Sequence, residues 1–182
     1  MLNFLKKRSY DLVTMFVTQI ALSIFGLALS LALPTTQPTL RIVTSVFSVL
    51  FYLFLIYTKV WDLGYKDMKA LNRGDAGYSR LEGLYLGIGA CSVNFIVAIL
   101  NTLIYIHKND ITSGMSGVSR IITLLTEGMY TGILATKING VELFKFAPMY
   151  FAILIPLIIT SMIAYYAGSK DFKLFSSRKG KN

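Results

Sequence analysis

The sequence contains few side chains that could catalyse a reaction or bind a metal. It has one histidine, His107, and one cysteine, Cys91, which are too few for a zinc site of the usual kind. Asp62, Asp67 and Asp75 lack the alternate-residue spacing of a calcium loop. Motifs for nucleotide binding and for a nucleophilic serine do not occur in the sequence. We therefore expect a protein that is not an enzyme and that has no cofactor and no metal.

Four polar residues in otherwise apolar stretches are the candidates for function: Gln19, Asn94, Asn101 and Glu127. A polar group in hydrocarbon is costly unless it bonds to a neighbouring helix or lines a hydrated cavity. The amides can therefore form hydrogen bonds between helices or line a path for a solute. On the membrane surface, Glu127 and Arg120 would simply be solvated. Inside the bundle, Glu127 would be the best candidate for a proton-coupled or cation-coupled carboxylate.

The elements that position these residues are four stretches without Asp, Glu, Lys or Arg, namely Leu12–Leu33, Ile42–Tyr57, Leu84–Ile106 and Ala147–Gly168. About 20 helical residues cross the roughly 30 Å hydrocarbon core of a bilayer. An apolar content of 54% and a mean hydropathy of +0.60 agree. We predict an all-α fold, a polytopic membrane helical bundle in which residues 1–182 form one domain with spans at about 12–33, 42–61, 84–106 and 147–168.

The basic residues Lys6, Lys7 and Arg8 ahead of the first apolar run also resemble the start of a signal peptide. The apolar region of a signal peptide is about 7–15 residues long. The run Leu12–Leu33 is longer than that. We therefore expect this segment to be a retained transmembrane helix.

A weaker apolar stretch covers residues 118–136. Arg120, Thr123, Glu127 and Thr131 recur there at helical spacing and form a polar stripe opposite apolar residues. This pattern favours one amphipathic helix, either on the membrane surface or re-entrant. The alternative is a fifth span over Val118–Ile138, which would place the basic tail on the outer side.

The positive charges predict an orientation. With the N-terminus inside, the cytoplasmic face carries thirteen of the eighteen Lys and Arg residues, and the outer face carries only Arg41, Lys108, Arg120, Lys137 and Lys145. The positive-inside rule then places both termini in the cytoplasm, and we expect a bacterial cytoplasmic membrane. Because the net charge of +9 collects in these loops, we expect the lipid bilayer as partner and no nucleic acid.

Small residues and prolines predict how the helices pack. Gly83 and Gly87 lie on one face of the third span with Asn94 and Asn101, and Gly26 lies on the polar line of the first span. Such residues allow close helix contacts in lipid. Pro156 in the fourth span predicts a kink, with Thr160 or Ser161 bonding a freed carbonyl.

The predicted cytoplasmic segments are a polar loop over residues 62–82 and a basic tail over residues 169–182. Trp61, Lys66 and Arg73 in or beside the loop are the residues expected to contact lipid or a partner.

Two functions compete on this sequence. The first is a non-catalytic membrane subunit or accessory protein that acts through a membrane-protein partner or as a homo-oligomer. The alternative is an oligomeric transporter or channel for a small solute or an ion, with Gln19, Asn94, Asn101 and Glu127 along its path. The first is favoured because four spans are few for a transporter.

Overall fold

The structure is a computed structural model of the chain, and it describes residues 2–34, 36–74, 79, 81–106, 112–138 and 140–172. Its long helices are α1 (Leu2–Ala32), α2 (Pro38–Asn72) and α3 (Glu82–Ile106). The shorter helices are α4 (Thr112–Glu127), η1 (Gly128–Tyr130), α5 (Thr131–Leu134), η2 (Leu143–Lys145), α6 (Ala147–Ala152) and α7 (Ile155–Ser169). The strands β1 (Lys137–Ile138) and β2 (Val141–Glu142) form one antiparallel pair.

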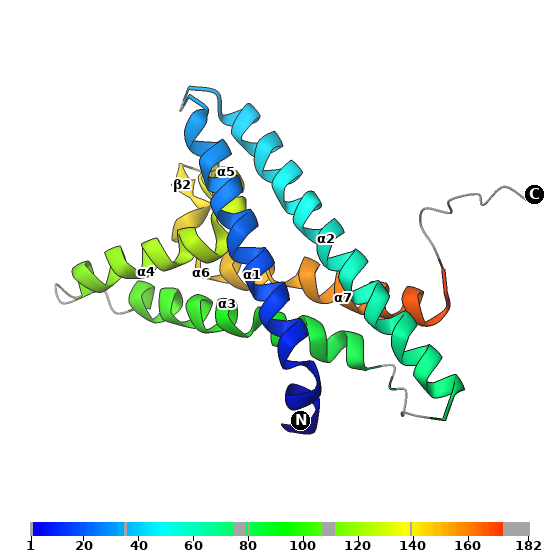
Figure 1. Ribbon diagram of the computed structural model, residues 1–182. Coiled ribbons are helices and arrows are strands. Elements are labelled where there is room, and N and C mark those ends of the chain that lie inside the picture. Colours follow the sequence, from blue (N-terminus) through cyan, green and yellow to red (C-terminus); the bar gives the residue numbers. More distant parts are fainter. Residues whose placement is uncertain are drawn as a thin grey trace, which may run out of the picture.

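Four helical segments are long and apolar enough to cross a membrane, namely Arg8–Ala32, Pro38–Asn72, Glu82–Ile104 and Pro148–Ser169. The predicted all-α membrane bundle is thereby confirmed. Figure 1 shows α1 and α2 joined by a tight turn at one end, while α3 and α4 lie side by side and α7 lies against α2.

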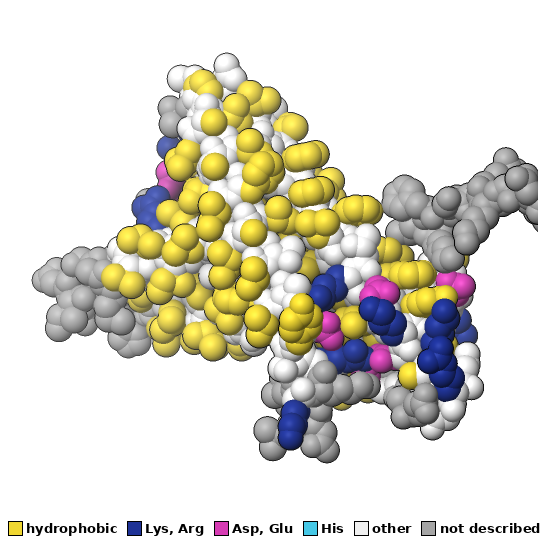
Figure 2. Space-filling view, in the orientation of Figure 1, with side chains coloured by type: hydrophobic (Ala, Val, Ile, Leu, Met, Phe, Trp, Pro, Cys, Tyr) yellow, Lys and Arg dark blue, Asp and Glu magenta, His cyan; other side chains and the backbone are white. Residues whose placement is uncertain are grey.

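The bundle has two distinct ends. We call one the charged end, where α1 and α3 begin and α2 and α7 finish; it carries Arg8, Asp67 and Glu82. We call the other the hairpin end, where α1 turns into α2 and the β1–β2 pair lies. Figure 2 shows Lys, Arg, Asp and Glu gathered at the charged end and in a smaller group near the β1–β2 pair, with hydrophobic side chains between them. This is the surface that a lipid-embedded bundle requires.

The predicted loop 62–82 is wrong over its first half, because α2 continues without a break to Asn72. Lys66 pairs with Asp62 one turn earlier at 2.5 Å, and such pairs support a helix. The helix stops where Gly74 adopts a left-handed backbone conformation with φ +81°. The second span is therefore part of a helix that extends well beyond the uncharged stretch.

Pro156 interrupts the fourth span as expected, but by a break rather than a kink. Helix α6 ends at Ala152, and α7 begins at Ile155 with the proline in its first turn, where its missing N–H costs nothing. The carbonyl of Ile153 in the break accepts a hydrogen bond from the Tyr130 hydroxyl at 3.2 Å. The predicted partner Ser161 instead has a buried hydroxyl without a hydrogen bond to any described residue.

The predicted helix 118–136 is divided into α4, η1 and α5. Within α4, Ser119, Thr123, Thr126 and Glu127 are buried, whereas Arg120 and the apolar residues Val118, Ile121, Ile122 and Leu125 are exposed. A helix on the membrane surface would keep these polar residues in water, not inside the protein. The surface alternative is therefore wrong for this segment, whose polar face points into the protein.

The chain turns back on itself within residues 112–134, and we call this part the re-entrant segment. Helix α4 packs beside the second half of α3, where Asn101 lies, and reaches the middle of α1 at Thr126. The chain then turns at η1, and α5 leads back to Arg41 near the start of α2. Figure 1 shows that α4 begins at a tip beside the end of α3, apart from the α1–α2 turn, whereas α5 lies near the start of α2. The helix is interrupted at η1, so the fifth span over Val118–Ile138 does not form.

Candidate functional site

Glu127 is the last residue of α4 and lies at the innermost turn of the re-entrant segment. It is only 1% exposed, and neither carboxylate oxygen has a hydrogen-bond partner among the described residues. Arg120, seven residues earlier, is exposed and lies over the ring of Phe144. The solvated pair considered from the sequence is therefore wrong, because only Arg120 remains at the surface.

Hydrogen bonds to α1 hold the end of α4 in the bundle. The carbonyl of Thr126 accepts one bond from Gln19 Nε2 at 3.0 Å and one from Ser23 Oγ at 2.7 Å. Carbonyls in the last turn of a helix have no partner within that helix. The side chains of α1 supply the missing donors and so position Glu127.

A small cavity lies beside this turn, with room for about one water molecule. It is lined by Gln19, Tyr52, Asn94, Met129, Tyr130, Ile153, Leu154 and Leu157. These residues lie on α1, α2, α3, η1 and α7 and in the break between α6 and α7. The Oδ1 atom of Asn94 is buried and has no hydrogen-bond partner among the described residues.

Glu127 and this cavity belong to one polar region. Glu127 directly precedes η1, and Met129 and Tyr130 of η1 line the cavity. We call Gln19, Tyr52, Asn94, Glu127 and Tyr130 the central polar cluster.

The four predicted polar residues divide into two pairs. Gln19 uses its amide nitrogen on Thr126, and its oxygen accepts a bond from the Tyr52 hydroxyl at 3.4 Å. Asn101 donates to Thr123 at 2.8 Å and accepts from Ser119 at 2.6 Å. Both amides are therefore fixed by hydrogen bonds within the fold. Asn94 and Glu127, by contrast, keep oxygens that could accept a bond from a ligand.

The three glycines predicted for helix packing lie at close contacts between elements. A Cβ atom at Gly26 would lie 2.6 Å from Met129 Cα, at Gly83 2.7 Å from Tyr165 Cβ, and at Gly87 3.0 Å from Ile158 Cα. The tightest contact was not predicted from the sequence. A Cβ atom at Gly168 would lie 2.0 Å from the carbonyl oxygen of Trp61, so α2 and α7 touch backbone to backbone there.

The three residues predicted to contact lipid or a partner lie near the C-terminal end of α2. Trp61 donates its indole N–H to the carbonyl of Phe172 at 2.7 Å and therefore also anchors the chain that follows α7. Lys66 and Arg73 are exposed. The tail beyond Phe172, like His107 and Asp75, lies outside the described residues.

A second charged site was not predicted from the sequence. Arg8, which is 6% exposed, donates to the carboxylates of Asp67 and Glu82, the latter at 3.0 Å. The Tyr165 hydroxyl donates to the same two residues at 2.8 and 3.1 Å. We call these four residues the Arg8 cluster, and they join all four spans at the charged end. The sequence signal was weak: Arg8 and Glu82 lie just before uncharged runs, but Asp67 lies ten residues after one, among other charged residues.

Fold and site together define a helical membrane protein with a re-entrant segment that carries a buried carboxyl group. Comparisons with family models, with curated proteins and with solved structures found no match for this chain. The chemistry available to the central polar cluster is binding, since a carboxyl and an amide oxygen can accept a proton, a hydrogen-bond donor or a cation.

Proposed function

We propose that this protein is a membrane transport protein in which Glu127 and Asn94 bind a proton or a small cation on its way through the bundle. The observation that supports this most is the Glu127 carboxyl group, buried at the centre with no partner for either oxygen among the described residues. Ionisable groups at membrane depth are expensive and tend to be functional.

The atoms without hydrogen-bond partners indicate the charge of the ligand. The three such oxygens of the central polar cluster are Oε1 and Oε2 of Glu127 and Oδ1 of Asn94. All three are acceptors when the carboxyl group is ionised. A proton, a metal cation or an ammonium group would satisfy them, whereas an anion would be repelled. The proposed ligand is therefore positive.

The proposal includes an orientation and an assembly. The charged end faces the cytoplasm of a bacterial cell under the positive-inside rule, so the re-entrant segment enters from the outer side. Because four spans are few for a transport path, we propose that the protein works as a homo-oligomer. The role of accessory subunit, favoured from the sequence, rests on partner contacts and stays a prediction.

The test is transport into liposomes that contain the purified protein. A trapped pH-sensitive dye reports protons under an imposed pH gradient, and radioactive Na⁺ or Rb⁺ reports the uptake of metal cations. We expect movement of at least one of these ions for the parent protein and its loss for Glu127→Gln, because an amide cannot carry the negative charge. The control is Glu142→Gln on β2, which removes a half-buried carboxylate at the hairpin end.

This control distinguishes the loss of the Glu127 carboxylate from the loss of a carboxylate elsewhere in the protein. Glu142→Gln should transport like the parent protein. The proposal is overturned if the parent shows no movement of any of these ions, or if Glu127→Gln transports as fast as the parent.

A further inference from the structure

Helix α2 is too long for the bilayer alone. Twenty residues separate Arg41 from Trp61, which corresponds to about 30 Å of helix and matches the hydrocarbon core. The helix nevertheless continues to Asn72. Its last three turns therefore lie at the level of the lipid headgroups and just beyond them, at the charged end.

These last turns carry a row of basic side chains. Lys66, Lys69 and Arg73 are three and four residues apart, so they lie on one face of the helix. All three are exposed. Lys66 pairs with Asp62 at 2.5 Å, whereas Lys69 and Arg73 form no ion pair with a described acidic residue. We call these three residues the basic row.

Among the described residues, acidic side chains neutralise this face only in part: Asp62 and Asp171 reach the surface, and the exposed Lys170 adds a further positive charge. The carboxylates of Asp67 and Glu82 point inward to Arg8 and Tyr165, and their side chains are each 12% exposed. Figure 2 shows dark blue side chains along the outer part of the charged end, with magenta acidic side chains beside them. With the basic row and Lys170 counted against Asp62 and Asp171, the described surface residues of this face keep a net positive charge.

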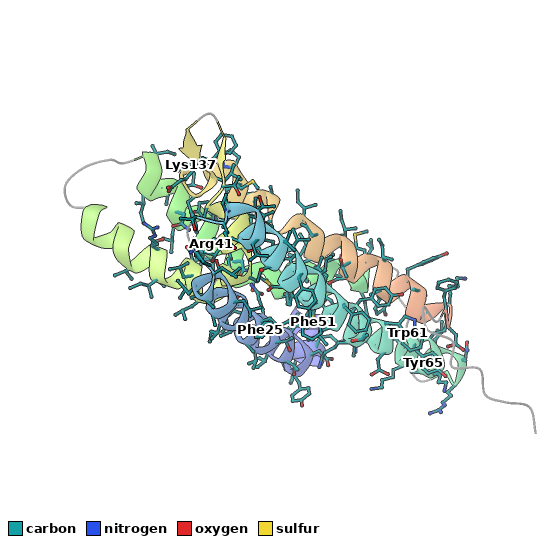
Figure 3. The ribbon with its side chains drawn as sticks, turned by 90° about the horizontal axis from the view of Figure 1, so that it is seen from above. Phe25, Arg41, Phe51, Trp61, Tyr65 and Lys137 are labelled. Atoms are coloured by element: carbon teal, nitrogen blue, oxygen red, sulfur yellow. The ribbon has the colours of Figure 1, made fainter. Side chains whose placement is uncertain are left out.

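Aromatic rings lie at the start of the basic row. Trp61 and Tyr65 stack with their centroids 5.3 Å apart, and the ammonium group of Lys69 lies 4.4 Å from the centre of the Tyr65 ring. Figure 3 shows both rings at the end of the bundle opposite Arg41 and Lys137. Trp and Tyr prefer the headgroup level. The rings therefore place the basic row at the depth of lipid phosphates.

We propose that the basic row, with Trp61 and Tyr65, binds the headgroups of anionic phospholipids. A phosphate group beside Trp61 would lie within reach of Lys66 and Lys69, and Arg73 would add long-range attraction. The site depends on the position of α2 in the bilayer and on none of the residues proposed for transport. It can therefore hold even where the transport proposal fails.

The test is native mass spectrometry of the full chain, exchanged from detergent micelles that contain equal amounts of phosphatidylglycerol and phosphatidylcholine. One variant combines Lys66→Gln, Lys69→Gln and Arg73→Gln. The matched control combines Lys6→Gln, Arg120→Gln and Lys137→Gln, which removes the same charge at exposed positions elsewhere. Bound lipid is counted for the parent protein and for both variants at low and at high salt.

We expect the parent protein to retain phosphatidylglycerol over phosphatidylcholine by about tenfold or more, since each basic residue near an anionic surface adds a several-fold preference. The preference should fall with salt and disappear in the basic-row variant while the control keeps it. Equal retention of the two lipids by the parent overturns the proposal. An equal loss of the phosphatidylglycerol preference in both variants also overturns the proposal, because the preference would then depend on net charge alone.

Discussion

Arg8 is a buried cation that joins carboxylates from two other helices. Both carboxylates are distant from Arg8 in the sequence. Asp67 is 59 residues and Glu82 is 74 residues away. Burying such charges is costly, so an ion pair of this kind stabilises a fold only while all its partners are present. The Arg8 cluster is therefore a point at which the bundle is sensitive to single substitutions.

Replacing Arg8 tests this sensitivity. Arg8→Gln should lower the free energy of unfolding by about 3 kcal/mol, because it leaves two carboxylates without their shared guanidinium. The measurement is reversible unfolding in mixed micelles. Lys66→Gln, which breaks an exposed pair with Asp62, should behave like the parent protein. Equal stability of the Arg8 and Lys66 variants would contradict the assigned role of the cluster.

The two asparagines of α3 should respond differently to the same change. Asn101→Leu removes bonds to Ser119 and Thr123 and should cost about 1–2 kcal/mol, as expected for hydrogen bonds between membrane helices. Asn94→Leu removes an oxygen with no bond to a described residue and should cost less, while impairing transport. The same unfolding measurement checks the order, and a larger loss for Asn94→Leu would refute this assignment.

At the scale of elements, the four spans were predictable because an uncharged run of about 20 residues is a local property. The polar line Gln19, Ser23 and Ser30 was likewise visible as helical spacing, and it is buried. The direction of α4 was not predictable. An amphipathic pattern has the same period whether its polar side faces water or a polar interior, so only the tertiary contacts of Thr126 and Glu127 decide it.

The end of α2 and the contact at Gly168 were missed for a related reason. Charged residues after Trp61 suggested a loop, yet a helix can leave the membrane and continue in water. Gly168 gave no sign of its role, since its neighbour Trp61 is remote in sequence and contributes a backbone carbonyl. Packing between distant segments leaves little trace in a single sequence.

The contact between α2 and α7 leads to a prediction at this scale. Gly168→Ala should destabilise the bundle by about 1–3 kcal/mol, because its Cβ atom would lie 2.0 Å from the Trp61 carbonyl oxygen. Gly117→Ala in α4 meets no atom within 4 Å and should be neutral or stabilising. Thermal unfolding of both variants checks this, and a harmless Gly168→Ala would mean that the helices can separate without cost.

In the whole molecule, ion pairs and hydrogen bonds hold the four spans together at the charged end, and the re-entrant segment contributes Glu127 and Tyr130 to the central polar cluster. The Arg8 cluster joins the four spans at one end, and the re-entrant segment fills the space between α1, α2 and α3 at the other. The short helices η1 and α5 pack tightly there: a Cβ atom at Gly128 would lie 2.6 Å from the carbonyl oxygen of Ser23, and one at Gly132 would lie 2.2 Å from that of Arg41.

Chemical labelling tests most directly whether Glu127 is a protonatable carboxyl group inside the membrane. A membrane-soluble carbodiimide reacts with protonated carboxyl groups in apolar surroundings, and the modified residue can be mapped by mass spectrometry. We expect modification at Glu127, which a bound cation would suppress, and little modification at the half-exposed Asp62. Modification of Asp62 and Glu142 that leaves Glu127 untouched, with or without added cation, would contradict this expectation.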